Sequence, residues 1–325
     1  MRVLITGGFG CIGAWIIREL ITRQVPVFVY DIREDRRRLR LIMQESEHQQ
    51  ATYISGDITD RERLEAVCRD LGISHIVHLA AWQVPLCRAD PIRGAQINVI
   101  GTLNVLETMR RLNGQIQNLV YASSAAVYGH PERYAENQDL DETAPLLPET
   151  HYGAYKVCNE LNARVYYLEH GVPSVGLRPW TVYGVGRDLG MTSEPTKAIL
   201  AVALGKPYRI SYGGWQDFQY AEDVARAFVR CLERPARQAV VYNLRGVLAD
   251  MPTFLKTLAQ VAPKAETLLS YTERQLPIAP RLSDARWQRD YGPLTITPLE
   301  DGIRETLERF RALRQRGLLS EADLT

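Results

Sequence analysis

The chain has 325 residues, of which 39 are Lys or Arg and 38 are Asp or Glu, so its formal net charge is +1. This balance argues against a nucleic-acid binder, which carries a basic excess, and against a partner membrane of anionic lipid. Because 46% of the residues are hydrophobic and 24% are charged, the composition is that of a globular protein rather than a disordered one.

Compartment and metal content are indicated by the apolar runs and the cysteines. No apolar run approaches the roughly 20 residues needed to cross a bilayer, and the N-terminal residues lack the layout of a signal peptide. The five cysteines are scattered and form no C-x-x-C pair. We therefore expect no membrane span, no disulfide framework, no metal site and a location in the reducing cytoplasm.

Short β-branched runs alternate with longer amphipathic stretches in the first half of the chain. The expected strands are Val3–Ile5, Val27–Tyr30, Thr52–Ile54, His75–Leu79, Leu119–Ala122 and Ser174–Leu177. The expected helices are Ile12–Thr22, Arg61–Leu71, Ile92–Leu112 and Tyr152–Glu169. This alternation predicts an α/β fold, a doubly wound parallel sheet with helices on both faces. Such a sheet binds ligands at the carboxyl ends of its strands.

The pattern loosens after Pro179, where Gly, Pro and Tyr become frequent. Expected elements there are the strands Tyr208–Ser211 and Val240–Leu244 and the helices Asp223–Glu233, Pro252–Val261 and Pro298–Leu313. We predict a smaller lobe that completes a site above the sheet. The charged segment Arg33–Gln50, with Arg36, Arg37 and Arg38 inside it, is predicted to be a solvated helix face.

A glycine-rich loop follows the first expected strand and opens the first expected helix. Its glycines, Gly7, Gly10 and Gly13, form a G-x-x-G-x-x-G pattern. Gly7 allows a tight turn, Gly10 lets the backbone approach a pyrophosphate, and Gly13 lets helix and strand pack closely. The helix N-terminus then presents free N–H groups to the anion. The loop therefore predicts a dinucleotide site.

Two carboxylates are placed to meet the adenosine end of such a cofactor. Asp31 ends the second expected strand, where a carboxylate accepts hydrogen bonds from the ribose hydroxyls and repels a 2′-phosphate. This position favours NAD over NADP, although Arg33 and the arginines after it are able to attract a phosphate. Asp57 and Ile58 follow the third strand and are candidates for the adenine edge, with Asp57 as acceptor and Ile58 as an apolar contact.

Three further side chains suggest acid–base chemistry. Tyr152 and Lys156 are four residues apart in an expected helix and so lie on one face of it. A neighbouring ammonium favours the phenolate and lowers the pKa of the phenol, which then takes a proton from a secondary alcohol or returns one to a ketone. The lysine can also hold the nicotinamide ribose. Ser124, at the end of an expected strand, can orient the same substrate oxygen.

Together these pieces resemble an extended short-chain dehydrogenase/reductase of the NAD-dependent sugar epimerase/dehydratase family, over nearly the whole chain. The resemblance rests on residues 6–13, Asp31, Asp57, Ile58, residues 78–81, Asn98, residues 101–104, residues 123–129, residues 152–156, residues 177–179 and residues 182–184.

The resemblance implies a Rossmann-type sheet, bound NAD, Tyr152 as acid/base, Lys156 on the nicotinamide ribose and Ser124 as the orienting hydroxyl. It implies cofactor contacts from Gly7, Phe9, Gly10, Cys11, Ile12, Gly13, Asp31, Asp57, Ile58, Leu79, Ala80, Ala81, Asn98, Tyr152, Lys156 and Pro179. Asn98 is equally well explained as a hydrogen-bonding residue inside a helix. The resemblance also implies a homodimer that pairs two long helices. Leu103, Leu106, Leu161 and Val165 are apolar enough for that interface, and contact with the chain's own sheet is the alternative.

The two residues after the serine narrow the reaction within this family. Family dehydratases carry an acidic pair there, whereas this chain has Ala125 and Ala126. Dehydration and cysteine-dependent epimerisation are therefore disfavoured. Two reactions remain, epimerisation by oxidation and re-reduction of a carbinol, and net dehydrogenation. A non-catalytic dinucleotide sensor is a third reading, disfavoured because Ser124, Tyr152 and Lys156 are all present.

The second lobe departs from the nucleotide-sugar pattern of the family. Thr181 stands where Asn is usual, and Gln216 stands where Arg is usual. A diphosphate ordinarily needs bidentate arginines. The substitution at position 216 therefore argues against a nucleotide-diphosphate sugar and favours a free sugar, sugar acid or hydroxyketone as substrate. Expected substrate contacts are Gln83, Ser124, Ala125, Thr181 and Arg187, with residues 191–196 as a substrate-side loop. Arg187 and Arg209 are candidates to meet a carboxylate, although surface charge is the favoured explanation for each of them. We divide the chain into an NAD-binding domain, residues 1–178, and a mainly substrate-binding lobe, residues 179–325.

Overall fold

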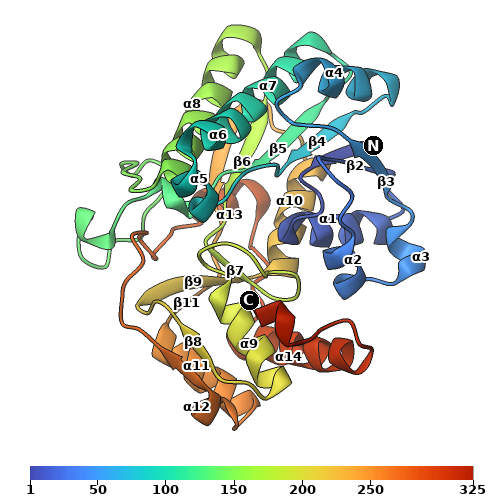
Figure 1. Cartoon of the computed structure of the whole chain (residues 1–325). Coiled ribbons are helices and arrows are strands. Elements are labelled where there is room, and N and C mark those ends of the chain that lie inside the picture. Colours follow the sequence, from blue (N-terminus) through green and yellow to red (C-terminus); the bar gives the residue numbers. More distant parts are fainter. Residues whose placement is uncertain (325) are drawn as a thin grey trace.

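A seven-stranded parallel sheet forms the centre of the computed structural model, which describes residues 1–324 (Figure 1). The strand order is β10-β6-β5-β4-β1-β2-β3, and every neighbouring pair is parallel. The strands are β1 Val3–Thr6, β2 Val27–Asp31, β3 Thr52–Ser55, β4 His75–His78, β5 Asn118–Ala122, β6 Ser174–Arg178 and β10 Ala239–Asn243. The order reverses between β1 and β4, so a ligand crevice is expected there. The predicted doubly wound α/β fold is confirmed.

Helices cover both faces of this sheet because successive strand residues point to opposite sides. In β1, Val3 and Ile5 join the core cluster around α1, whereas Leu4 joins the cluster on the other face. One layer consists of α4 Arg61–Asp70, α7 Gly101–Arg111 and α8 His151–His170, and the other is built on α1 Cys11–Thr22 and α10 Ala221–Glu233. Between the two layers, β1, β4 and β6 are buried along their whole length.

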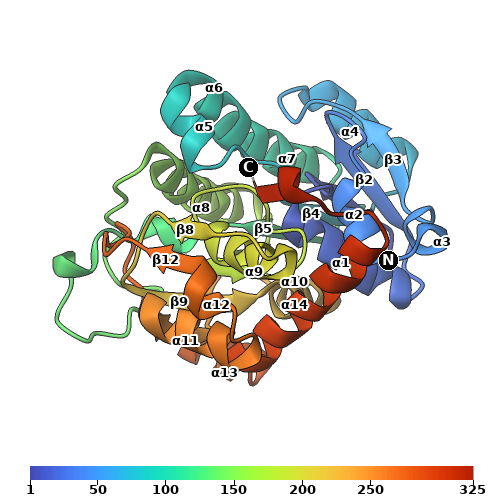
Figure 2. The same cartoon turned by 60° about the horizontal axis from the view of Figure 1, so that its bottom comes forward.

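The second lobe is built from small sheets and helices, in the lower half of Figure 1 and at the front of Figure 2. Its strands are β7 Thr181–Tyr183, β9 Trp215–Tyr220 and β11 Val247–Asp250 in one sheet, and β8 Tyr208–Ile210 and β12 Leu269–Tyr271 in another. Its helices are α9 Glu194–Leu204, α11 Met251–Val261, α12 Ala265–Leu268 and α14 Leu299–Gln315. From the same half of the sequence, β10, α10 and α13 Ala285–Tyr291 return to the central sheet.

The segment expected as one helix from Ile92 to Leu112 is interrupted. It comprises α6 Pro91–Ala95, a π-helical turn Gln96–Ile100 and α7, and it follows the short helix α5 Val84–Ala89. The backbone carbonyl of Asn98 accepts hydrogen bonds from Asn159 Nδ2 at 2.9 Å and from Thr102 Oγ1 at 2.7 Å. These bonds accompany the local widening of the helix, a feature that is common beside functional sites.

The charged segment after β2 differs from the prediction. It forms the short helices α2 Arg37–Ile42 and α3 Glu45–His48, but two of its arginines do not project freely into solvent. Arg37 Nη1 lies 2.6 Å from Asp188 Oδ2, and Arg38 Nη2 lies 2.7 Å from Asp188 Oδ1. The segment therefore ties the cofactor domain to the loop after β7. Short 3₁₀ turns at Ala125–Val127, Pro131–Arg133 and Glu321–Leu324 complete the elements.

A buried ion pair joins α8 to the central sheet. Arg178, at the end of β6, places Nη2 2.6 Å and Nε 2.8 Å from the two carboxylate oxygens of Glu160. Both side chains are at most 6% exposed. Glu160 also accepts a hydrogen bond from Ser123, and Arg178 donates to the Tyr128 hydroxyl at 2.7 Å. The network thus fixes the helix, the end of β5 and the turn after it relative to one another.

We predict that Glu160→Gln lowers the free energy of unfolding by about 3–5 kcal/mol, because it leaves the buried guanidinium of Arg178 without a countercharge. Denaturant unfolding of the purified variant measures this loss. The matched control is Glu300→Gln, which removes the exposed partner of Arg304 within α14 and should cost less than about 0.5 kcal/mol. Equal effects of the two changes would contradict the role given to the buried pair.

Candidate active site

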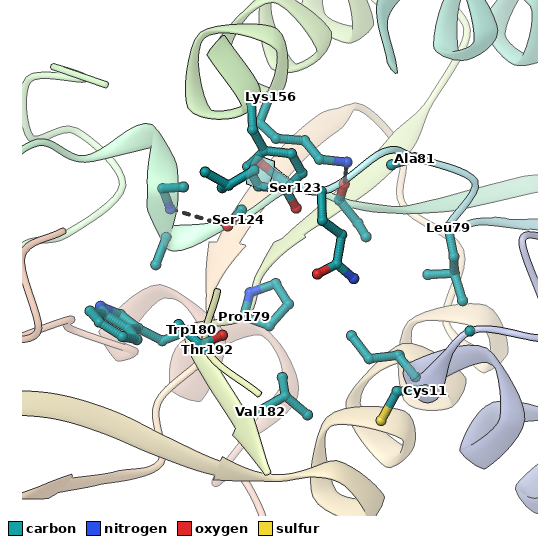
Figure 3. Close-up of a pocket in the computed structure, with 18 of the residues that line it drawn as sticks. Cys11, Leu79, Ala81, Ser123, Ser124, Lys156, Pro179, Trp180, Val182 and Thr192 are labelled. Carbon is teal, nitrogen blue, oxygen red and sulfur yellow. Dashed lines mark hydrogen bonds between the residues drawn. The ribbon is translucent and has the colours of Figure 1, made fainter. Parts of the chain in front are cut away.

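Two adjoining pockets follow the carboxyl edge of the sheet and share the residues Gly7, Gly10, Leu79, Ala81 and Gln83. The first, the reaction pocket, lies between the sheet and the second lobe. Figure 3 shows Lys156, Ser124, Trp180, Cys11 and Leu79 arranged around it. The second, the adenosine pocket, runs from the glycine loop to the ends of β2 and β3. Together they form one groove across the point where the strand order reverses.

The glycine loop has no room for side chains at two of its three predicted positions. A Cβ on Gly7 would lie 2.7 Å from the backbone of Ala80, and the φ of Gly7 is +67°. A Cβ on Gly13 would lie 2.5 Å from the Gly8 carbonyl oxygen. Gly10 caps the N-terminus of α1, where the first backbone N–H groups face the groove with the positive end of the helix dipole. This cradle fits a pyrophosphate.

The adenosine pocket contains the predicted carboxylates. Asp31 accepts backbone hydrogen bonds from Ile32 and Phe9, and burial raises its pKa. Asp57 accepts two hydrogen bonds from Thr59, at 2.9 and 2.8 Å, and lies 3.2 Å from Arg93. Although burial opposes ionisation, these partners hold the pKa of Asp57 below its usual range. The pocket lining also includes Phe9, Ile58 and Ala80 as predicted, together with Arg33.

Tyr152, Lys156 and Ser124 converge in the reaction pocket. The first turn of α8 is capped by Thr150, whose side chain accepts a hydrogen bond from the Gly153 N–H. This places Tyr152 and Lys156 opposite the end of β5. Lys156 Nζ lies 5.4 Å from the ring centroid of Tyr152 and donates to the Ala122 carbonyl at 2.7 Å. Ser124 begins the turn after β5 and accepts a hydrogen bond from the Ala126 N–H at 3.1 Å.

The protonation of this cluster differs from the prediction that the lysine lowers the pKa of the phenol. Burial raises the pKa of Tyr152, and only a hydrogen bond with Ser124 and the charge of Arg187 oppose it. Burial also lowers the pKa of Lys156 to about 8. The prediction overlooked this desolvation, which affects Lys156, 4% exposed, and the partly buried Tyr152. At neutral pH the structure therefore pairs a neutral phenol with an ammonium.

Behind the pocket, His78 holds β4 and α7 together. Its Nδ1 lies 2.7 Å from Thr6 Oγ1 and its Nε2 lies 3.0 Å from Thr102 Oγ1. Burial lowers the pKa of His78 to about 3, so the ring is neutral. A neutral histidine adds no positive charge beside Lys156, which favours retention of the ammonium proton.

Most predicted contacts line the groove, but Asn98, Thr181 and the exposed Arg209 do not. The reaction pocket contains Cys11, Ile12, Leu79, Ala81, Gln83, Ala125, Pro179 and Arg187. Asn98 instead binds the backbone of Trp82 through both ends of its amide, at 2.7 and 2.9 Å, and so supports the segment that forms the pocket wall. Thr181 donates its hydroxyl to Gln216 at 2.8 Å and is fully buried inside the second lobe.

The structure adds wall residues that the sequence did not single out. Val84, Val182 and Ile278 contribute apolar surface, and Trp180 is held in the wall by a 2.8 Å hydrogen bond from Nε1 to the Ala279 carbonyl. In the expected substrate-side loop, Met191 and Thr192 line the pocket. Ser193 and Thr196 instead make backbone hydrogen bonds that shape the loop. Only the proline before Trp180 offered a signal for that residue.

Neither a membrane span nor a metal cluster is present among residues 1–324. No helix in this part of the chain is long and apolar enough to cross a membrane. The same residues contain no group of three or more His, Cys, Asp or Glu side chains placed to hold a metal ion.

Comparisons with known proteins agree with this geometry. The chain is 32% identical to protein CapI of Staphylococcus aureus over 250 residues, covering 73% of this chain and 70% of that protein. It is 28% identical to dTDP-glucose 4,6-dehydratase of Salmonella typhimurium over 349 residues, covering 97% and 94% of the two chains. Among solved structures, UDP-glucose 4-epimerase of Thermus thermophilus in complex with NAD superimposes with a TM-score of 0.77, at 28% identity and with 96% and 99% of the chains covered.

The family model described as "NAD dependent epimerase/dehydratase family" matches residues 3–244, which include the glycine loop, most of the lining of both pockets and all of α8. NAD is accordingly the cofactor that the groove accommodates. The chain belongs to the NAD-dependent epimerase/dehydratase family of the short-chain dehydrogenase/reductase superfamily.

Proposed function

We propose that this protein catalyses hydride transfer at a secondary hydroxyl of a sugar or sugar-like substrate, with Tyr152 as the acid/base. The observation that carries the proposal is the convergence of Tyr152, Lys156 and Ser124 in the reaction pocket, beside the N-terminus of α1. This groove also supplies the cradle for NAD, so cofactor and proton-transfer group are side by side.

Each of the three side chains has a physical role in the reaction. Ser124 orients the substrate hydroxyl, and the phenolic oxygen of Tyr152 takes the proton from that hydroxyl when the carbinol is oxidised. The phenol first releases its own proton to solvent, and the hydrogen bond with Ser124 and the charge of Arg187 favour this ionisation against burial. The ammonium of Lys156, 5.4 Å from the ring, would hold the nicotinamide ribose. NAD, when bound, accepts the hydride. Because Trp180 and Ile278 add apolar surface to the pocket wall, bound substrate and wall together keep water from the developing charge.

Two outcomes of this chemistry fit the family. An epimerase retains the reduced cofactor and returns the hydride to the other face of the carbonyl, whereas a net dehydrogenase releases both products. One relative is a dehydratase, so sequence similarity alone is also compatible with elimination of water. Ala125 and Ala126 are buried in the turn after Ser124 and offer no acid or base for that elimination. This disfavours elimination. Several relatives are named as epimerases, so we propose epimerisation, with net dehydrogenation of a small sugar, sugar acid or hydroxyketone as the alternative.

A homodimer is part of the proposal. Leu161 and Val165 are 54% and 44% exposed on α8, and Ile100 is 46% exposed on the neighbouring π-helical turn. Large exposed apolar side chains on two adjoining elements are typical of a protein interface. Leu106, which the sequence also suggested, is buried in the chain's own core and does not take part.

We predict that Tyr152→Phe lowers kcat by about 10²- to 10⁴-fold, because the variant lacks the group that moves the proton. Its affinity for NAD, measured by calorimetric titration, should be unchanged. The matched control is Tyr155→Phe, one turn along the same helix, whose hydroxyl donates to the Pro91 carbonyl at 2.7 Å outside the pocket. Full turnover by Tyr152→Phe would contradict the catalytic assignment.

The preference for NAD over NADP is assigned to Asp31. We predict that Asp31→Asn shifts the ratio of the two dissociation constants towards NADP by at least about tenfold, or ~1.4 kcal/mol. The change removes the negative charge that repels a 2′-phosphate, and it leaves Arg33 in the pocket lining. Glu34→Gln is the control, because Glu34 pairs with Arg36 and does not line the pocket. An unchanged ratio in Asp31→Asn would refute the assignment.

A further inference from the structure

One guanidinium in the reaction pocket is not neutralised. Arg187 follows β7 and lines the pocket that contains Tyr152 and Ser124. Its Nη2 donates to Thr192 Oγ1 at 3.0 Å, whereas its Nε is buried and has no hydrogen-bond partner. Among residues 1–324, no carboxylate forms an ion pair with Arg187. Nε has almost no exposed surface, so a ligand cannot reach it directly. Nη1 is not among the buried atoms and makes no hydrogen bond within residues 1–324, so this end of the guanidinium is the donor available to a molecule that enters the pocket.

The carboxylate next to Arg187 in sequence, Asp188, is bound to arginines of the cofactor domain. Asp188 accepts a hydrogen bond from Arg37 at 2.6 Å and two from Arg38 at 2.7 and 2.9 Å. Arg38 also donates to the Phe9 carbonyl in the glycine loop at 3.0 Å. These bonds pin the loop that carries Arg187 to the cofactor domain, and they occupy the one acidic group next to it in sequence. Arg187 is therefore held in place with its charge available to a ligand.

Thr192 completes an anion-binding pair. Its oxygen accepts from Arg187, and its own hydroxyl proton, which needs a different acceptor, is donated to no group within residues 1–324. The Nη1 donor of a guanidinium together with a neighbouring hydroxyl suits the two oxygens of a carboxylate. In residues 1–324 the only cationic side chains that line the reaction pocket are Arg187 and Lys156, and Lys156 is bound to Ala122. One available cation suits a single carboxylate better than a diphosphate.

We propose that Arg187 and Thr192 bind a carboxylate of the substrate, so that the protein acts on a hydroxy acid of the sugar-acid class. This inference rests on the proposed function, since Tyr152 must receive the hydroxyl of the same molecule. The substrate then bridges the pocket, with its secondary hydroxyl at Tyr152 and Ser124 and its carboxylate at Arg187. The carboxylate can belong to a free sugar acid or to a nucleotide-linked one, and the two sources are separated by the test.

A competing anion is the pyrophosphate of the cofactor. Arg187 also acts electrostatically on Cys11, at the start of α1, where it opposes the burial that raises the pKa of that thiol to about 11. The backbone N–H groups of the glycine loop already serve the pyrophosphate. Arg187 comes instead from the second lobe, together with Met191 and Thr192 on the substrate side. The affinity for NAD distinguishes these two roles.

The test measures binding of matched acid and neutral probes to the NAD-loaded protein by calorimetry, with turnover followed in parallel. The pairs are D-gluconate with D-glucitol, D-glucuronate with D-glucose, and UDP-glucuronate with UDP-glucose. In at least one pair we expect the acid to bind about 10- to 100-fold more tightly than its neutral partner, as for a charge-assisted hydrogen bond. A preference in the third pair alone identifies a nucleotide-linked acid.

Variants test whether the preference for the acid comes from Arg187 or from the positive charge of the lobe in general. Arg187→Gln should abolish the preference for the acid and leave the dissociation constant of NAD unchanged, and Arg187→Lys should retain part of the preference. Arg209→Gln is the matched control, because Arg209 is an exposed arginine of the same lobe outside the pocket lining. Tyr152→Phe should retain the preference for acid over neutral probes while losing turnover. Failure of the catalytic assignment can therefore be distinguished from failure of the carboxylate inference.

Three results would overturn the inference. The first is that no acid binds more tightly than its neutral partner in any of the three pairs. The second is that Arg187→Gln keeps the preference for the acid. The third is that Arg187→Gln weakens NAD binding to the same extent as acid binding, which would assign Arg187 to the cofactor pyrophosphate.

Discussion

The active groove depends on the buried ion pair between Glu160 and Arg178. Both side chains are almost completely buried, so each charge requires the other. The pair joins the middle of α8 to the end of β6, and through Ser123 and Tyr128 it also holds the end of β5 and the turn after it. These contacts oppose rotation or sliding of the helix along the sheet. The positions of Tyr152 and Lys156, on the first turns of the same helix, follow from that constraint.

A second set of charges fixes the opposite wall of the groove. Arg37 and Arg38 hold Asp188, and Arg38 also reaches the glycine loop, so the second lobe is tied to the cofactor domain where Arg187 enters the pocket. The two ionic connections thus separate two tasks. The pair behind α8 holds the acid–base group, and the cluster around Asp188 holds the group that we assign to the substrate carboxylate.

The sequence predicted the parallel sheet, the glycine loop and the spacing of Tyr152 and Lys156, because these depend on local periodicity and on motifs within a few residues. It did not predict features that depend on contacts between distant segments. The pairing of Arg37 and Arg38 with Asp188 spans about 150 residues, and the return of β10 to the central sheet has no local signal. The raised pKa of Tyr152 comes from burial, which requires the assembled pocket. Thr181 was misplaced because its partner, Gln216, lies on a different strand.

The central claim is that carbon-bound hydrogen passes from a carbinol of the substrate to the cofactor in this groove. The direct measurement is a single turnover, in which NAD-loaded protein is mixed with its best substrate among the acid and neutral probes, labelled with deuterium at the carbinol carbon. We expect reduced nicotinamide absorbance to appear, transiently for an epimerase or lastingly for a dehydrogenase, and more slowly with deuterium than with hydrogen. Product formed with no reduced nicotinamide at any time and no isotope effect would contradict this claim.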